Sequence, residues 1–210
     1  MKEFKGNFLI LRKFPYGEGD LIIHALSEEG QKRSFIAKGG MRSKKRFGGG
    51  ILEPTHHVTL LYKGNEKSEG TLFLLSEADL INDFPLIRKD YDRLEFGLSV
   101  VKAAAAVGQE GDQGSNSLYL LIGHTLKALE KVEDLETLKV QFYIKLLRQQ
   151  GVLQVSEWMH PFIRESLHSS DKLKEVRLNF RDEVRRLNQM AEEYLKTAES
   201  HHSYSPDNAR

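Results

Sequence analysis

The sequence from residue 8 to residue 40 reads FLILRKFPYGEGDLIIHALSEEGQKRSFIAKGG. It contains three apolar-rich runs, and clusters of turn-forming residues at 15–20 and 28–30 separate them. The third run alternates basic and apolar residues, which is typical of a strand with one buried face. The pattern therefore predicts three short strands joined by tight turns: Phe4–Leu11, Leu21–Leu26 and Lys32–Lys38.

Two further strand-like runs follow, Val58–Tyr62 and Thr71–Leu75, with a turn at Gly64-Asn65 between them. No segment long enough to be a crossover helix separates the five runs. Short strands at this spacing indicate a small barrel rather than βαβ units.

Helical periodicity begins near residue 76, where Ser76-Glu77-Ala78-Asp79 resembles a helix start. We expect a barrel domain at residues 1–78, a helical domain at 79–200 and a flexible tail at 201–210. A loop rich in Gly, Gln and Ser at 108–114 interrupts the helices. The helices themselves are expected at Asp90–Val107, Leu118–Leu129, Leu135–Arg148 and Asp171–Thr197.

Composition excludes several classes of protein. The chain has 210 residues and no cysteine, so disulfides and thiolate catalysis are absent and a zinc site would need His and carboxylates. The first apolar run is too short for a signal peptide, and no run reaches the roughly 18 apolar residues of a membrane span. We expect a cytoplasmic protein.

The charge is distributed unevenly. Residues 1–50 carry eleven Lys and Arg against five Asp and Glu, although the whole chain has a net charge of only +1. The segment Lys32–Arg46 holds seven cations, and no acid lies between Glu29 and Glu53. Cations beside flexible glycines suit a phosphate backbone, because they displace its counterions and let it approach closely.

These residues define the predicted nucleic-acid site, although a solvated loop is the alternative for any charge run. Tyr16 and Phe47 are predicted to stack on bases, whereas Phe35 fits a core position better. Weak sequence preference is expected because no base-reading element is present. The phosphate contacts are predicted to be Arg33, Lys38, Arg42, Lys44, Lys45 and Arg46, supported by Arg12, Lys13 and Lys32.

No catalytic constellation emerges from the sequence, so no enzyme, cofactor or metal is predicted. Gly48-Gly49-Gly50 lacks the Gly-Lys-Ser/Thr of a P-loop. The pair His56-His57 cannot chelate one metal ion on a strand, where adjacent side chains point to opposite faces.

The ordered motifs of the first 80 residues resemble the RecO family of recombination mediators. These motifs are Pro15-Tyr16-Gly17-Glu18-Gly19-Asp20-Leu21, Glu29-Gly30, Lys38-Gly39-Gly40 followed by Arg42-Ser43-Lys44, Leu52-Glu53-Pro54, and the exit Leu74–Leu80. The resemblance implies an α+β fold, with a five-stranded OB-fold barrel followed by an all-helical domain.

The resemblance also implies a function. It implies binding of single- and double-stranded DNA, annealing of complementary strands and loading of the RecA recombinase during repair. The implied partners are RecR and the single-strand binding protein, whose acidic tail docks on the helical part of family members. Candidate cations for that tail are Arg88, Lys89, Lys139, Lys145 and Arg148.

One departure concerns the C-terminal half, where many relatives carry a four-cysteine zinc module that this chain lacks. Two alternatives to a DNA mediator therefore stay open. One is a protein-interaction adaptor in which the barrel is only scaffold. The other is an RNA-binding barrel protein without annealing activity.

Overall fold

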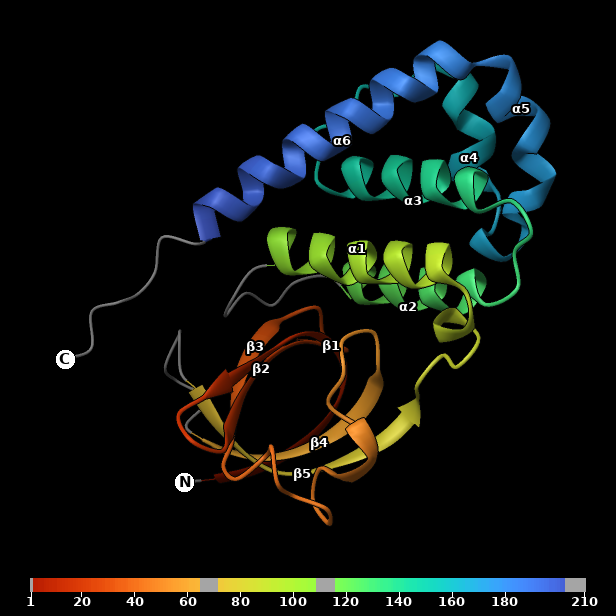
Figure 1. Cartoon of the computed structure of the whole chain (residues 1–210). Coiled ribbons are helices and arrows are strands. Elements are labelled where there is room, and N and C mark those ends of the chain that lie inside the picture. The colour runs from red at the N-terminus through yellow and green to blue at the C-terminus, as the bar shows by residue number, and fades with distance from the viewer. Residues whose placement is uncertain (1, 65–71, 109–115, 203–210) are drawn as a thin grey trace.

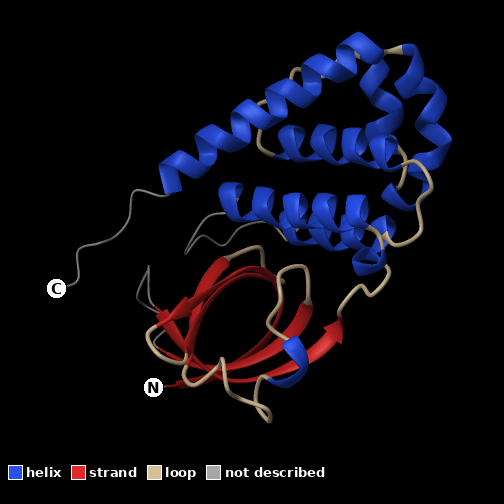
Figure 2. Ribbon diagram, viewed as in Figure 1, coloured by secondary structure: helices blue, strands red, loops and turns tan. Residues whose placement is uncertain are grey.

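The computed structural model describes residues 2–64, 72–108 and 116–202. It has two layers, a β-barrel formed by the N-terminal strands and a helical layer formed by the rest of the chain (Figure 1). Figure 2 shows the strands confined to the barrel, with one short helical turn beside them. The predicted α+β class, barrel first and helices after, is confirmed.

The barrel is closed in the order β1-β2-β3-β5-β4. Strand β3 pairs with β5 in parallel, and the other four pairings are antiparallel. The closed five-stranded barrel expected from the sequence is thus present. The strands are β1 (Lys2–Tyr16), β2 (Asp20–Ser27), β3 (Lys32–Ala37), β4 (His57–Gly64) and β5 (Leu72–Asn82).

Strand β1 contributes to two hydrophobic cores at once. Phe8 and Ile10 point into the barrel, whereas Leu9 and Leu11 belong to the core under the helices. Alternation accounts for all four residues, because successive side chains of a strand point to opposite faces. Leu11 sits at a β-bulge, where the pairing with β2 shifts between residues 10 and 12.

The helical layer lies on this outer face of β1. Helix α1 packs against β1 and β2, α2 and α6 pack against α1, and α3 packs against α2 and α6 (Figure 1). Among the described helices, none is long and apolar enough to cross a membrane. The α-helices are α1 (Tyr91–Val107), α2 (Ser117–Leu129), α3 (Leu135–Gln149), α4 (His160–Arg164), α5 (Lys174–Asn179) and α6 (Arg181–His202), and the 3₁₀ turns are η1 (Gly48–Gly50), η2 (Ile87–Lys89), η3 (Glu157–Met159) and η4 (Leu167–Leu173).

The helix start predicted at Ser76-Glu77-Ala78-Asp79 is wrong, because these residues continue strand β5. Their backbone pairs with β4, with Ala78 opposite Leu60 and Asp79 opposite Thr59. Pairing with a strand distant in sequence overrides the local helical pattern. The domain boundary at residue 78 stays a prediction.

The single last helix predicted from Asp171 to Thr197 is also wrong. A 3₁₀ turn, α5 and α6 occupy this stretch, and the chain bends at Phe180, whose φ and ψ are −116° and 45°. The Phe180 ring stacks on Trp158 with centroids 5.8 Å apart, and this contact accompanies the bend. The predicted loop at 108–114 and the predicted tail at 201–210 lie almost entirely outside the described residues.

Candidate nucleic-acid interface

Two connections of the barrel meet at one end of it. The backbone N–H of Gly39 donates to Asp20 Oδ1 at 2.7 Å, and that of Met41 donates to the Gly19 carbonyl at 3.0 Å. These bonds hold the turn between β1 and β2 against the segment 38–52 that follows β3. The turn bearing Tyr16 and the cationic segment therefore form one continuous surface.

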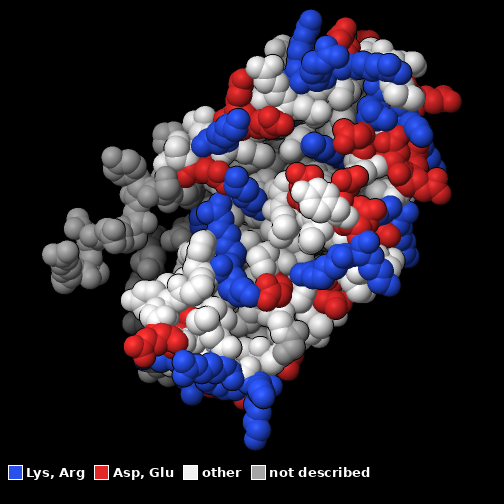
Figure 3. All heavy atoms as spheres, viewed as in Figure 1, with Lys and Arg blue, Asp and Glu red and all other residues white. Residues whose placement is uncertain are grey.

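We call residues 38–46 the cationic loop. Its cations are Lys38, Arg42, Lys44, Lys45 and Arg46, and all five side chains are exposed. The Arg46 guanidinium donates to the Lys38 carbonyl at 2.7 Å and lies 5.0 Å from the Phe47 ring, which shapes the loop. None of the five forms an ion pair with a described residue. Figure 3 shows Lys and Arg gathered at this lower end of the barrel.

The predicted cations on β1 already have acidic partners. Arg12 pairs with Glu199 of α6 at 3.0 Å, and Lys13 pairs with Glu53. Both pairs join residues distant in sequence, so the charge pattern could not show them. A phosphate would have to compete with these carboxylates.

The predicted cations on β3 are held by the protein itself. Lys32 is only 8% exposed, and its Nζ donates to the Ala105 carbonyl in the last turn of α1 at 3.3 Å. Arg33 donates to Gln31 Oε1 at 2.7 Å and to the Tyr62 hydroxyl. A cation at a helix C-terminus stabilises the unpaired carbonyls there, so Lys32 has a structural role.

The two predicted base platforms differ in exposure. The Tyr16 side chain is 55% exposed at the end of β1, next to the first turn, whereas Phe47 is 5% exposed and packs in the barrel core. Phe47 is therefore too buried to stack on a base, although it lines a cavity at this end of the barrel. Phe14, which was not among the predicted platforms, is 43% exposed and has a free face.

A period-two rule would have found Phe14, because it lies two residues from Tyr16 on the same strand. Arg12, Phe14 and Tyr16 pair with every second residue of β2 and therefore point to the same outer face. We call these three the outer row. Over four residues of strand it spans about 13 Å, from the helical layer to the cationic loop. The partners on β2 are His24, Ile22 and Asp20.

A cavity of about 450 Å³ lies between the first turn and the cationic loop. Pro15 and Met41 line it from the two connections, with Lys44 among the lining cations and Phe47 among the apolar side chains. An apolar hollow beside exposed cations can accept part of a nucleotide while its phosphate stays in solvent.

The two adjacent histidines make separate contacts. The His56 ring bonds the Ile51 carbonyl at 2.9 Å, and the Tyr119 hydroxyl lies 2.6 Å from His57 Nε2. Burial lowers the pKa of both histidines and raises the pKa of Tyr119 to about 12. These shifts favour the neutral forms of both groups, and their hydrogen bond links β4 to α2. Within the described ranges, no group of three His, Asp or Glu could hold a metal ion.

Of the helical cations considered for an acidic tail, two are engaged by backbone carbonyls. Arg88 donates to the Asp83 and Pro54 carbonyls at 3.0 and 3.2 Å, which fixes the connection between barrel and helices. Lys145 donates to the Ile163 carbonyl at 2.8 Å, and burial lowers its pKa. Lys89 and Arg148 are exposed, and Lys139 is half-buried.

The fold and the site together define a class: a closed OB-type barrel with a cationic end, followed by a helical layer. Comparison with known families agrees with this class. Residues 1–84 match the family described as Recombination protein O N terminal. Residues 1–84 therefore form an N-terminal domain of the RecO family.

Curated relatives extend the similarity into the helical layer. The chain is 30% identical over 149 residues to the DNA repair protein RecO of Maridesulfovibrio salexigens, covering 71% of this chain and 59% of that protein. It is 29% identical over 144 residues to the DNA repair protein RecO of Alkaliphilus metalliredigens, covering 68% and 56%. The similarity thus spans less than two thirds of the length of these relatives.

Proposed function

We propose that this chain acts in DNA repair and recombination by binding DNA strands through the barrel end. The observation that carries the proposal is the continuity of the outer row with the cationic loop, which puts exposed aromatic rings beside unpaired cations. Single-strand binding barrels combine these two features, because rings stack on bases of any sequence and cations neutralise the phosphates. The phosphate contacts are Lys38, Arg42, Lys44, Lys45 and Arg46.

The same surface supports strand annealing without a catalytic residue. Two complementary strands repel each other through their phosphates, and a cationic loop that screens this repulsion lets them meet. Contacts made only to the sugar-phosphate backbone of DNA also allow binding of double-stranded DNA, and they give weak sequence preference. In this proposal the protein is a mediator rather than an enzyme.

The partners follow from family membership and are part of the proposal. The relatives are named DNA repair proteins, and this chain would work on strands coated by the single-strand binding protein, together with RecR, to load RecA. The barrel, residues 1–78, would hold the DNA. The helical domain, residues 79–200, would contact the acidic tail of the single-strand binding protein.

Strand annealing with complementary oligonucleotides tests the proposal. The full chain is added to bare strands and to strands coated with single-strand binding protein, and duplex formation is followed by fluorescence energy transfer. Acceleration on both substrates is the expected result. A variant with Arg42, Lys44 and Lys45 replaced by Ala should lose most of the acceleration.

The contrary results are distinct. Binding to structured RNA in preference to single-stranded DNA would favour the RNA-binding alternative. Absence of binding to either nucleic acid at about 150 mM salt would leave a protein-interaction adaptor. If the protein annealed bare strands but not coated ones, the proposed DNA-binding surface would stand, and the single-strand binding protein would no longer be a proposed partner.

A further inference from the structure

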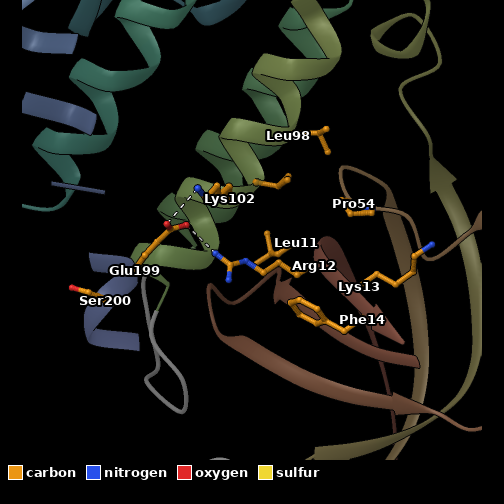
Figure 4. Close-up of a pocket in the computed structure, with 10 residues that line it drawn as sticks. Leu11, Arg12, Lys13, Phe14, Pro54, Leu98, Lys102, Glu199 and Ser200 are labelled. Carbon is orange, nitrogen blue, oxygen red and sulfur yellow. Dashed lines mark hydrogen bonds and ion pairs between the residues drawn. The ribbon is translucent and has the colours of Figure 1, made fainter. Parts of the chain in front are cut away.

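The end of α6 lies over a groove between the barrel and the helical layer. The groove has a volume of about 690 Å³, and Leu11, Phe14 and Leu98 form its apolar wall (Figure 4). Arg12 and Lys102 also line it, one from β1 and one from α1. A third lining cation, Lys13, pairs with Glu53. An apolar groove with cations and an exposed ring has the composition expected for a nucleotide site.

One carboxylate occupies the cationic side of this groove. Glu199 Oε1 lies 3.0 Å from Arg12 Nη2, and Glu199 Oε2 lies 3.3 Å from Lys102 Nζ. Both oxygens are therefore used, and two cations from different elements converge on a single anion (Figure 4). A phosphodiester resembles this carboxylate, because it also carries one negative charge and presents two terminal oxygens.

The β-bulge explains why Arg12 can reach this position. The extra residue in β1 lets Leu11 and Arg12 both face the helical layer, which a regular strand would not allow. Leu11 is buried there, and Arg12 extends toward α1 and α6. From Arg12 the outer row continues through Phe14 and Tyr16 to the cationic loop.

We propose that Arg12 and Lys102 form a phosphate-binding subsite for a DNA strand, and that Glu199 occupies this subsite in the free protein. A strand that binds along the outer row places one phosphate between the two cations and displaces the end of α6. The carboxylate therefore competes with DNA and lowers its affinity. This inference rests on the proposed DNA binding and adds a regulatory contact to it.

The ion pairs are half-exposed, so the competition is moderate. The Arg12 side chain is 39% exposed and that of Lys102 65% exposed, while Glu199 is 28% exposed. Exposed pairs weaken as salt screens them. Salt therefore opens the subsite while it also weakens DNA binding, and the inhibition by Glu199 should fade as salt rises.

Glu199→Gln tests the inference in the full chain, with a fluorescent oligothymidylate as probe. It should bind about threefold to tenfold more tightly than wild type at about 50 mM salt, with the gain shrinking toward 200 mM. Glu193→Gln is the matched control. It removes the same charge from α6 at an exposed residue whose carboxylate bonds only Gln189 among the described residues, and it should change affinity little.

Two further measurements separate competition from a general effect of charge. Adding Arg12→Gln to Glu199→Gln should abolish the gain, since the subsite then lacks its barrel cation. In wild type, oligothymidylate should raise amide exchange at residues 197–200 as the helix end is displaced. If saturating DNA left the amide exchange at these residues the same as in the DNA-free protein, the proposed displacement would be overturned.

The outcomes distinguish this inference from the proposed function. Equal affinities of Glu199→Gln and Glu193→Gln, with wild type still binding DNA, would overturn the subsite alone. An equal gain for a poly-glutamate peptide would overturn its assignment to a phosphodiester. No DNA binding by wild type or Glu199→Gln would overturn the inference and the proposed function together.

Discussion

The cations of the strands and those of the cationic loop differ in what their charges already contact. Arg12, Lys13, Lys32 and Arg33 each have a partner within the protein, either a carboxylate or a neutral oxygen. The loop cations are exposed and form no ion pair with the described residues, although Arg46 donates to the Lys38 carbonyl of the same loop. Tertiary partners decide which cations remain available to a ligand.

The difference arises from geometry. The four strand cations lie beside other elements of the fold, so their long side chains meet carbonyls and carboxylates there. The loop projects beyond the barrel and contains no acid. The comparison predicts that loop variants change DNA binding and strand variants change stability.

The largest expected effect comes from the cationic loop. Replacing Arg42, Lys44 and Lys45 by Ala should weaken oligothymidylate binding on the order of thirtyfold to a hundredfold at low salt, and lower the salt slope by about three. Fluorescence anisotropy at several salt concentrations measures both quantities. The melting temperature should stay within about 2 °C of wild type, since exposed side chains contribute little to stability.

A control removes equal charge from the helical layer, where the exposed Lys89, Lys127 and Lys131 are replaced by Ala. This control should retain most of the affinity. A loss equal to that of the loop variant would mean that overall charge, rather than the barrel end, governs binding.

The outer row should give the next largest effect. Replacing Phe14 and Tyr16 singly by Leu should each weaken single-strand binding by about 1–2 kcal/mol without changing the salt slope, because stacking is lost and no charge is removed. Phe47→Leu should instead lower stability by about 1 kcal/mol and leave affinity intact, since that ring lies in the core. If Phe47→Leu weakened DNA binding under conditions where the variant stays fully folded, Phe47 would again be a candidate for stacking on a base.

A strand cation should affect stability by a smaller amount. Lys32→Met keeps the apolar stem but removes the amine that bonds the Ala105 carbonyl. The free energy of unfolding measured in urea should therefore fall by about 1 kcal/mol. Lys38→Met, on the exposed loop, should leave unfolding unchanged and weaken DNA binding. If Lys38→Met lowered stability and Lys32→Met weakened DNA binding instead, the proposed difference between strand and loop cations would be wrong.

The smallest effect concerns pH. Burial lowers the pKa of His57 below 6.5, so the unfolded chain takes up a proton at a higher pH than the folded protein does. This contribution to stability is complete above pH 6.5 and is lost as the pH falls toward the folded pKa. Urea unfolding between about pH 7.5 and 5 should show the loss.

His57→Gln should flatten part of this pH dependence. Only part is expected, because burial also lowers the pKa of His56 and His168. Replacing the exposed His160 by Gln provides the control. An unchanged pH profile in His57→Gln would show that the link from β4 to α2 does not sense protonation.

The sequence predicts the five strands and the exposed loop because both depend on local patterns. Turn residues and alternation locate the strands, and a run of cations without acids locates the loop. The partners of Arg12 and Lys32 lie in α6 and α1, far along the chain, so no local pattern reveals them. Phe47 follows three cations in sequence, yet the loop folds it back into the barrel core.

The strand β1, which serves two cores, has a consequence for how the molecule unfolds. Leu9 and Leu11 would lose their apolar cover if the helical layer detached, while Phe8 and Ile10 on the same strand hold the barrel together. The two layers therefore cannot melt as independent units at low cost. Unfolding is therefore cooperative between the barrel and the helical layer, so a substitution in one layer alters the thermal transition of the other.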